Sequence, residues 1–147
     1  MVVKNSITDS FNCTLERAFR IAIHGDATTI LIGYGPVPPV IGFSKDETWG
    51  IIGGSRIPIM KGNFLVKAGD FGFDEIFERR DNEYWRWGVT KLGLSMFFAT
   101  MAQGEWWIIE NKNGAVTVKW TYTYFSRNVF TQPITWLFVK IFLEKYV

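Results

Sequence analysis

The sequence predicts an α+β fold, in which an antiparallel sheet is covered on one face by a helix at the C-terminal end of the chain. Two observations carry this prediction. From residue 47 to residue 125, aromatic and apolar residues alternate with polar ones at the period of a β-strand, and turn-forming pairs separate the segments. Residues 131–147 then form a mostly apolar stretch at helical spacing. We therefore expect this helix to cover the apolar face of the sheet.

The composition limits the classes of protein that fit. The 147 residues are expected to form a single domain, and an aromatic content of 17% favours a roomy interior lined by rings. The basic residues are scattered, so no nucleic-acid partner is predicted. The one cysteine, Cys13, fits a reducing compartment, and the polar residues 1–10 lack the apolar core of a signal peptide. We expect a cytoplasmic protein with no integral membrane segment.

The N-terminal part is expected to contain one strand and two short helices. Residues 3–11 alternate loosely and predict the first strand. Residues 15–22 have helical spacing, with Thr14 as the N-cap and Gly25 at the end. Asp26 can cap a second short helix that runs through Ile32, and a stiff loop rich in Gly and Pro follows it.

Two early strands, residues 48–52 and 56–60, are expected to meet at Gly53-Gly54, and Pro58 marks the second as an edge strand or a bulge. Residues 92–101 are expected to form a loop.

The middle hairpin decides which side chains face inward. Residues 71–79 and 83–90 are predicted to pair around a three-residue loop, 80–82. A two-residue loop would place arginines among the phenylalanines, so the three-residue loop is preferred. It puts one set of residues on the inner face: Phe71, Phe73, Glu75, Phe77, Trp85, Trp87 and Val89.

The last hairpin pairs residues 105–110 with 116–125. Asn113-Gly114 between them is a strong signal for a two-residue type I′ turn. This turn predicts that Trp107 and Ile109 share a face with the aromatic row of the second strand, namely Val118, Trp120, Tyr122 and Tyr124.

The C-terminal helix is expected to begin with Thr131 as its N-cap and Pro133 in its first turn. At 3.6 residues per turn its inner face would comprise Ile134, Phe138, Ile141 and Phe142. Trp136 and Leu143 would lie on the outer surface, where they could form the contact of a homodimer.

Local similarities then point to a family. They comprise residues 13–19 after the first strand, 54–56 between early strands, 75–78 in the middle strand, and the long terminal helix. With these segments in this order, the chain resembles the START-like (SRPBCC) superfamily, which includes the birch-pollen allergen group and the polyketide cyclase/dehydrase group. The resemblance implies a helix-grip fold, in which a curved sheet of six to seven strands wraps around the terminal helix and encloses a hydrophobic cavity.

The expected function is binding of a small hydrophobic molecule, such as a lipid, a polyketide or an aromatic metabolite, without a cofactor. A first alternative is an enzyme of the cyclase, dehydratase or hydrolase kind that uses Glu75 with a tyrosine or Arg56. A second alternative is an interaction protein whose cavity is filled by its own rings. The expected ligand-binding residues are Phe73, Glu75, Phe77, Trp85, Trp87, Trp107, Trp120, Tyr122, Tyr124, Phe138, Ile141 and Phe142.

Glu75 is the carboxylate singled out by this register. An isolated charge among four large rings is costly, so Glu75 is expected either to have a raised pKa or to pair with Arg56. His24 and Cys13 are the only histidine and cysteine, so no transition-metal site is predicted.

Overall fold

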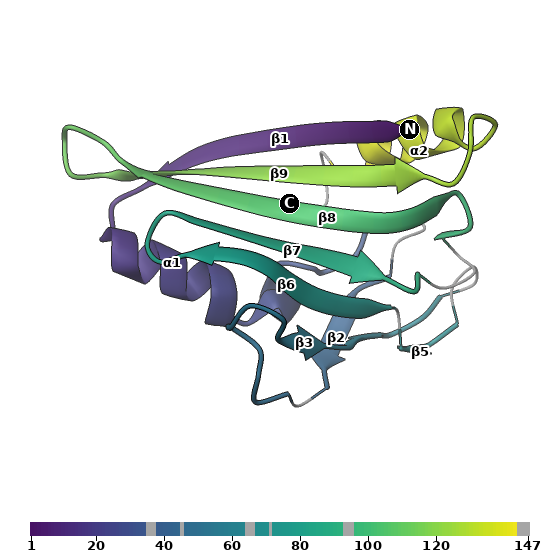
Figure 1. Ribbon diagram of the computed structural model, residues 1–147, viewed down its shortest axis with the longest axis horizontal. Coiled ribbons are helices and arrows are strands. Elements are labelled where there is room, and N and C mark those ends of the chain that lie inside the picture. The colour runs from purple at the N-terminus through teal and green to yellow at the C-terminus, as the bar shows by residue number, and fades with distance from the viewer. Residues whose placement is uncertain (35–37, 45, 64–66, 71, 93–95, 144–147) are drawn as a thin grey trace.

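The computed structural model describes residues 1–34, 38–44, 46–63, 67–70, 72–92 and 96–143. Among these residues a large antiparallel sheet has the strand order β1-β9-β8-β7-β6-β3, and a small sheet has the order β2-β4-β5 (Figure 1). The α+β class is therefore confirmed. The strands are β1 (Val2–Phe11), β2 (Val40–Phe43), β3 (Ser55–Arg56), β4 (Pro58–Met60), β5 (Gly69–Asp70), β6 (Phe73–Arg80), β7 (Tyr84–Thr90), β8 (Ala99–Glu110) and β9 (Val116–Ser126).

The first helix forms as predicted. Helix α1 (Leu15–His24) begins where the Thr14 hydroxyl accepts a hydrogen bond from the Arg17 amide at 3.2 Å. It ends where the Gly25 amide donates to the Ile21 carbonyl at 2.8 Å. The predicted second helix is wrong in length, because Asp26 caps only one 3-10 turn, η1 (Ala27–Thr29).

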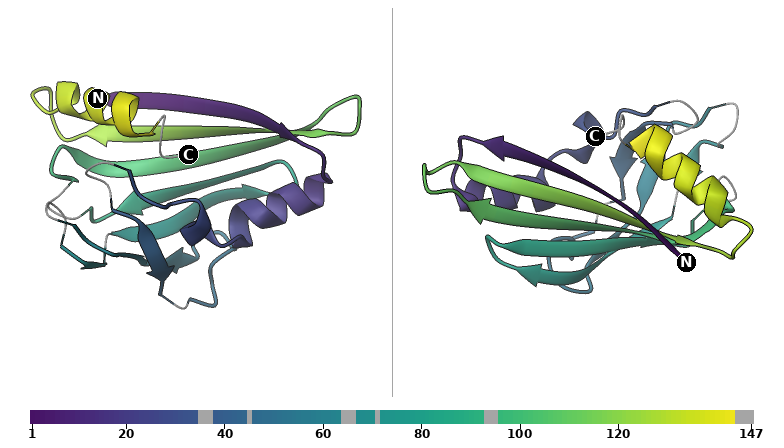
Figure 2. Two further views of the ribbon diagram at one scale, coloured as in Figure 1. Left: turned by 180° about the vertical axis from the view of Figure 1, so that it is seen from behind. Right: turned by 90° about the horizontal axis from the view of Figure 1, so that it is seen from above.

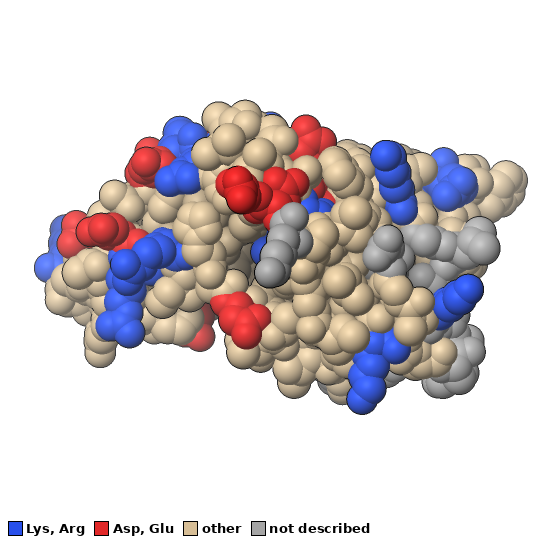
Figure 3. All heavy atoms as spheres, turned by 90° about the horizontal axis from the view of Figure 1, so that it is seen from below, with Lys and Arg blue, Asp and Glu red and all other residues tan. Residues whose placement is uncertain are grey.

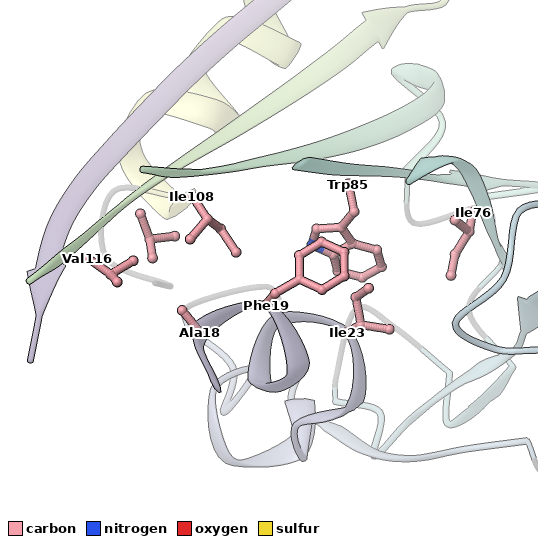
Figure 4. Close-up of a cluster of buried hydrophobic side chains, with 8 residues drawn as sticks. Ala18, Phe19, Ile23, Ile76, Trp85, Ile108 and Val116 are labelled. Carbon is pink, nitrogen blue, oxygen red and sulfur yellow. The ribbon is translucent and has the colours of Figure 1, made fainter. Parts of the chain in front are cut away.

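Two helical segments cover the same face of the large sheet at opposite ends (Figure 2). At one end, Phe19 and Ile23 of α1 pack against Trp85, as Figure 4 shows. At the other end, the C-terminal segment comprises α2 (Gln132–Phe138) and the π-helix η3 (Val139–Leu143). There, Val139 is fully buried and Phe138 packs against Tyr124 with ring centroids 5.7 Å apart. The inner face of the sheet thus has a hydrophobic core at each end.

The prediction for residues 48–60 is wrong in its pairing. Residues 48–53 form turns, because the Asp46 carboxylate accepts hydrogen bonds from both the Thr48 amide and the Thr48 hydroxyl, at 2.8 and 2.5 Å. Strand β3 pairs with β6, while β4 pairs with β2 and β5. Strand β2 lies after the predicted loop rich in Gly and Pro, in residues for which the sequence predicted no element. Residues 99–101, predicted as loop, belong to β8.

The hairpin of β6 and β7 differs from the prediction through a bulge. Its loop has three residues, 81–83 rather than the predicted 80–82, and Arg80 pairs with Tyr84 next to it. A bulge at Phe77 then shifts the register by one residue, so that Ile76 pairs with Trp87. Because a shift of one residue exchanges the two faces of a strand, Glu75 lies on the outer face and its neighbour Asp74 on the inner face. Phe71 lies outside the described residues.

The hairpin of β8 and β9 also differs by one residue. The Gly114 amide donates to the Asn111 carbonyl, Asn111 donates to the Ala115 carbonyl, and Gly114 alone in this turn has a positive φ, +79°. This is the pattern of a three-residue loop with glycine in the left-handed region, not of a two-residue type I′ turn. Trp106 therefore pairs with Trp120, and Trp107 lies on the outer face, as does Ile109.

The C-terminal helix is shorter in the described residues than predicted. It is α-helical for seven residues and π-helical for five. The Thr131 side chain makes no capping hydrogen bond, because its hydroxyl bonds to the Asn128 backbone instead. Thr135 and Val139 are the fully buried residues of this segment, whereas Ile134 and Ile141 are exposed, contrary to the prediction. The side chains of Phe142 and Leu143 lie outside the described residues.

Candidate functional site

A cavity of about 160 Å³ lies on the inner face of the large sheet. Strands β6 to β9 form one wall, and the opposite wall comes from α1, the residues around η1, and strands β2 and β4. The lining is mostly apolar. It consists of Ile21, Ala22, Gly25, Ala27, Ile30, Leu31, Val40, Phe43, Arg56, Pro58, Met60, Asp74, Trp85, Trp87, Val89, Leu92, Met96, Ala102, Trp106, Trp120, Tyr122, Tyr124 and Phe138.

The sheet wall is a continuous layer of aromatic rings. Trp85 stacks on Trp87 with centroids 4.6 Å apart, and Trp120 contacts Trp106 at 4.6 Å and Tyr122 at 4.7 Å. Pairs at these separations add stability beyond the area that they bury.

Gly104 explains how the ring of Trp87 fits into this layer. A Cβ atom on Gly104 would collide with the six-membered ring of Trp87. The absence of a side chain there lets the six-membered ring of Trp87 approach the backbone of β8 closely.

One ion pair lies in this apolar lining. Arg56 Nε donates to Asp74 Oδ2 at 3.3 Å, and the two side chains are only 15% and 6% exposed. The guanidinium carbon of Arg56 also lies 3.7 Å from the ring centroid of Phe43 and 3.8 Å from that of Trp49. Two rings on the guanidinium hold the cation in place through cation–π attraction.

Burial controls the ionisation of this pair. Desolvation raises the pKa of the Asp74 carboxyl to about 6, although the charge of Arg56 opposes the shift. Desolvation likewise lowers the pKa of the Arg56 guanidinium, against the opposing effect of Asp74. A single hydrogen bond therefore does not offset the loss of water around the carboxylate.

The structure brings seven of the predicted site residues to the cavity: Arg56, Trp85, Trp87, Trp120, Tyr122, Tyr124 and Phe138. Their role in ligand binding stays a prediction. Four others lie on the outer face of the sheet: Phe73, Glu75, Phe77 and Trp107. Ile141 is 43% exposed and is not part of the lining.

Sequence reasoning missed Asp74 and Trp106, which replace Glu75 and Trp107 in the cavity. Each is adjacent in sequence to the residue that was chosen. Arg56 was identified as the partner of a buried carboxylate, and its partner is Asp74. A signal that fixed the β6–β7 register would have found Asp74, and one that fixed the β8–β9 register would have found Trp106.

Outside this cavity, the residues that the structure describes also line a more open pocket between the start of α1 and the β8–β9 turn. Those residues hold no cluster of three His, Cys, Asp or Glu side chains that could bind a metal ion. On the face shown in Figure 3 the basic side chains are spread out, and acidic ones lie among them. No helix among the described residues is long and apolar enough to cross a membrane.

Known structures share this fold. Ara h 8.0201 has a TM-score of 0.66 and 10% identity, over 88% of this chain and 81% of the other. Norcoclaurine synthase from Thalictrum flavum, in complex with dopamine and hydroxybenzaldehyde, has a TM-score of 0.65 and 9% identity, over 93% and 77%. Major latex-like protein 151 from Panax ginseng has a TM-score of 0.63 and 12% identity, over 92% and 88%.

These likenesses show the fold and nothing more about this chain. The chain has the Bet v 1-like arrangement, which is consistent with the START-like fold that the sequence resembles. No protein-family model matches it, and no curated protein sequence matches it.

Proposed function

We propose that this protein binds a small hydrophobic molecule, of about the size of one substituted aromatic ring, in the cavity of the large sheet. The observation that carries the proposal is an apolar cavity of about 160 Å³ whose wall is a layer of tryptophan rings. An apolar cavity of about 150 Å³ is large enough to take up benzene. The rings of this layer offer such a ligand several aromatic faces and edges to pack against.

The cavity also favours binding over the two alternatives. The enzymatic alternative relied on Glu75, which lies on the outer face and pairs across the hairpin with Gly88. The cavity has one carboxylate among its described lining residues, Asp74, so a pair of carboxylates for acid–base chemistry does not converge there. The alternative of a self-filled interior fits poorly with the free volume.

Binding of p-xylene, followed by ¹H–¹⁵N NMR of the seven tryptophan indole groups, tests the proposal. We expect saturable shifts of the indole signals of Trp106 and Trp120, which line the cavity, and unchanged signals of Trp107 and Trp136. Absence of saturable binding to the folded protein would contradict the proposal.

Two neighbouring substitutions sharpen this test. Val89 lines the cavity and its neighbour Thr90 lies on the outer face of the same strand. Val89→Phe fills the cavity, so we expect the affinity for p-xylene to fall at least about tenfold. Thr90→Phe adds the same ring on the other face and should change the affinity less than about twofold. Equal effects of the two variants would place the bound molecule elsewhere.

A further inference from the structure

We infer that Asp74 determines the specificity of this cavity, by selecting an uncharged ligand that carries a hydroxyl group and rejecting carboxylates. This inference rests on the proposed function, because it concerns the polar end of a ligand that the apolar walls already hold. Three features of the cavity support it: the hydrogen bonds that Asp74 lacks, the fixed position of Arg56, and the indole groups of the wall.

The Asp74 carboxylate has one oxygen without a partner. Oδ2 accepts from Arg56 at 3.3 Å, whereas Oδ1 is buried and has no hydrogen-bond partner in the described part of the chain. Asp74 is 4% exposed and lines the cavity. A buried acceptor without a donor is costly. A ligand that donates a hydrogen bond to Oδ1 therefore gains binding free energy that a hydrocarbon cannot gain.

Arg56 makes the affinity of the cavity depend on the charge of the ligand. Its guanidinium lies between Phe43 and Trp49 and is hydrogen bonded to Asp74, so it stays beside the carboxylate. The pair is neutral as a whole when both groups are ionised. A ligand carboxylate would bring a second negative charge toward Asp74, and a ligand ammonium would bring a second positive charge toward Arg56. An uncharged donor places no charge of the same sign beside either Asp74 or Arg56.

The indole groups of the wall favour a hydroxyl among the uncharged donors. The ring nitrogens of Trp85, Trp106 and Trp120 are buried and have no hydrogen-bond acceptor among the described residues, and all three residues line the cavity. An indole N–H is a donor only. A hydroxyl oxygen accepts as well as donates, so a hydroxyl-bearing ligand suits both the carboxylate and the indole groups.

Four probes of nearly equal shape test this inference on the unmodified protein. They are p-cresol, p-xylene, 4-methylanisole and 4-methylbenzoate, titrated at pH 7.5 with the tryptophan indole signals as the readout. A hydrogen bond to a charged group contributes enough that p-cresol should bind about tenfold tighter than p-xylene or 4-methylanisole. The benzoate should bind weakest. Tighter binding of p-xylene than of p-cresol, or tightest binding of the benzoate, would overturn the inference.

Failure of the inference can be told apart from failure of the proposed function. If p-xylene and p-cresol bind equally, the cavity is a binding site and Asp74 does not select. If none of the four probes binds, the proposed function fails and the inference fails with it.

A pair of adjacent carboxylates supplies matched variants. Asp74→Asn should reduce the preference for p-cresol over 4-methylanisole at least threefold, because an amide oxygen is a weaker acceptor than a carboxylate. Glu75→Gln, one residue further on the outer face, should leave the preference unchanged. A preference that survives in a folded Asp74→Asn variant would overturn the inference. If that variant does not fold, the four probes on the unmodified protein still decide the question.

Discussion

Each face of the large sheet carries an arginine that lies over two aromatic rings and pairs with a carboxylate, but the two clusters differ in their exposure to solvent. On the inner face, Arg56 lies over two rings and pairs with Asp74. On the outer face, Arg80 lies 4.7 Å from the Tyr84 ring and 4.9 Å from the Trp107 ring, and pairs with Glu83 at 2.7 Å. The Arg56 side chain is 15% exposed and the Arg80 side chain 43%. The difference lies in what covers each cluster.

Among the residues that the structure describes, only the inner face has a second wall in front of it, built from α1, β2 and β4. Whether an aromatic ring or a charged group is hydrated depends on the presence of that wall, not on the type of residue. An aromatic content of 17% therefore does not by itself identify a cavity. The register of the two hairpins therefore decides which residues face the cavity. Four substitution or pH experiments test this assignment.

The largest expected effect is a loss of stability when Arg56 is replaced, and Arg80 on the outer face is its comparison. Arg56→Met removes the partner of a buried carboxylate, which should lower the free energy of unfolding by about 3–5 kcal/mol at pH 7.5. Arg80→Met breaks exposed ion pairs and should cost about 1 kcal/mol or less. Urea denaturation measures both values. Similar values for the two variants would mean that the inner pair is as well hydrated as the outer one.

Two glycines allow the same comparison for packing. A Cβ atom on Gly104 would collide with the Trp87 ring on the inner face, and one on Gly88 would collide with the Phe77 ring on the outer face. Each substitution to alanine should lower the free energy of unfolding by about 1–3 kcal/mol. Only Gly104→Ala should also weaken p-xylene binding, because it displaces a ring of the cavity wall. A ligand effect of Gly88→Ala would contradict the assignment of faces.

The ionisation of Asp74 should make stability depend on pH. Its pKa is about 6 in the folded chain and about 3.8 as the ordinary value, so the folded state binds the proton more tightly. The contribution of Asp74 to stability therefore rises as the pH falls from 7 to 5, by about 1 kcal/mol. Hydrogen bonds from Thr28 and Thr48 lower the pKa of Asp26 and Asp46, whose contributions are lost only below about pH 4.

Urea denaturation at pH 7 and pH 5 measures this effect, with Asp74→Asn as the reference. The gain between the two pH values should be smaller in that variant by about 1 kcal/mol. The same gain in both proteins would show that Asp74 does not titrate in this range.

The smallest effect is expected for Glu75. It lies on the outer face, so Glu75→Gln should change the free energy of unfolding by less than about 0.5 kcal/mol. The affinity for p-xylene should stay unchanged. Loss of binding in this variant would restore Glu75 as a site residue and would show that the bulge at Phe77 is misplaced.

The sequence predicted those elements whose signals are local. Thr14 and Gly25 defined the first helix because a cap and a terminating glycine act within one turn. The alternation of β9 predicted correctly that Trp120, Tyr122 and Tyr124 share a face, since that depends on one strand alone.

The assignments that failed depend on one residue in a turn or a bulge. Asn-Gly fits both a two-residue type I′ turn and a three-residue loop with glycine in the left-handed region, and the two differ by one step in register. The adjacent tryptophans 106 and 107 made both choices equally apolar. The bulge at Phe77 has no glycine or proline to mark it, so Asp74 and Glu75 exchanged places.

Intermolecular nuclear Overhauser effects between the methyl protons of bound p-xylene and the tryptophan rings show directly whether the cavity on the inner face is the binding site. We expect effects from the ligand to Trp87, Trp106 and Trp120, and none to Trp107, which lies on the opposite face of β8. Effects to Trp107 or to the exposed Trp136, without any to Trp106, would contradict the account.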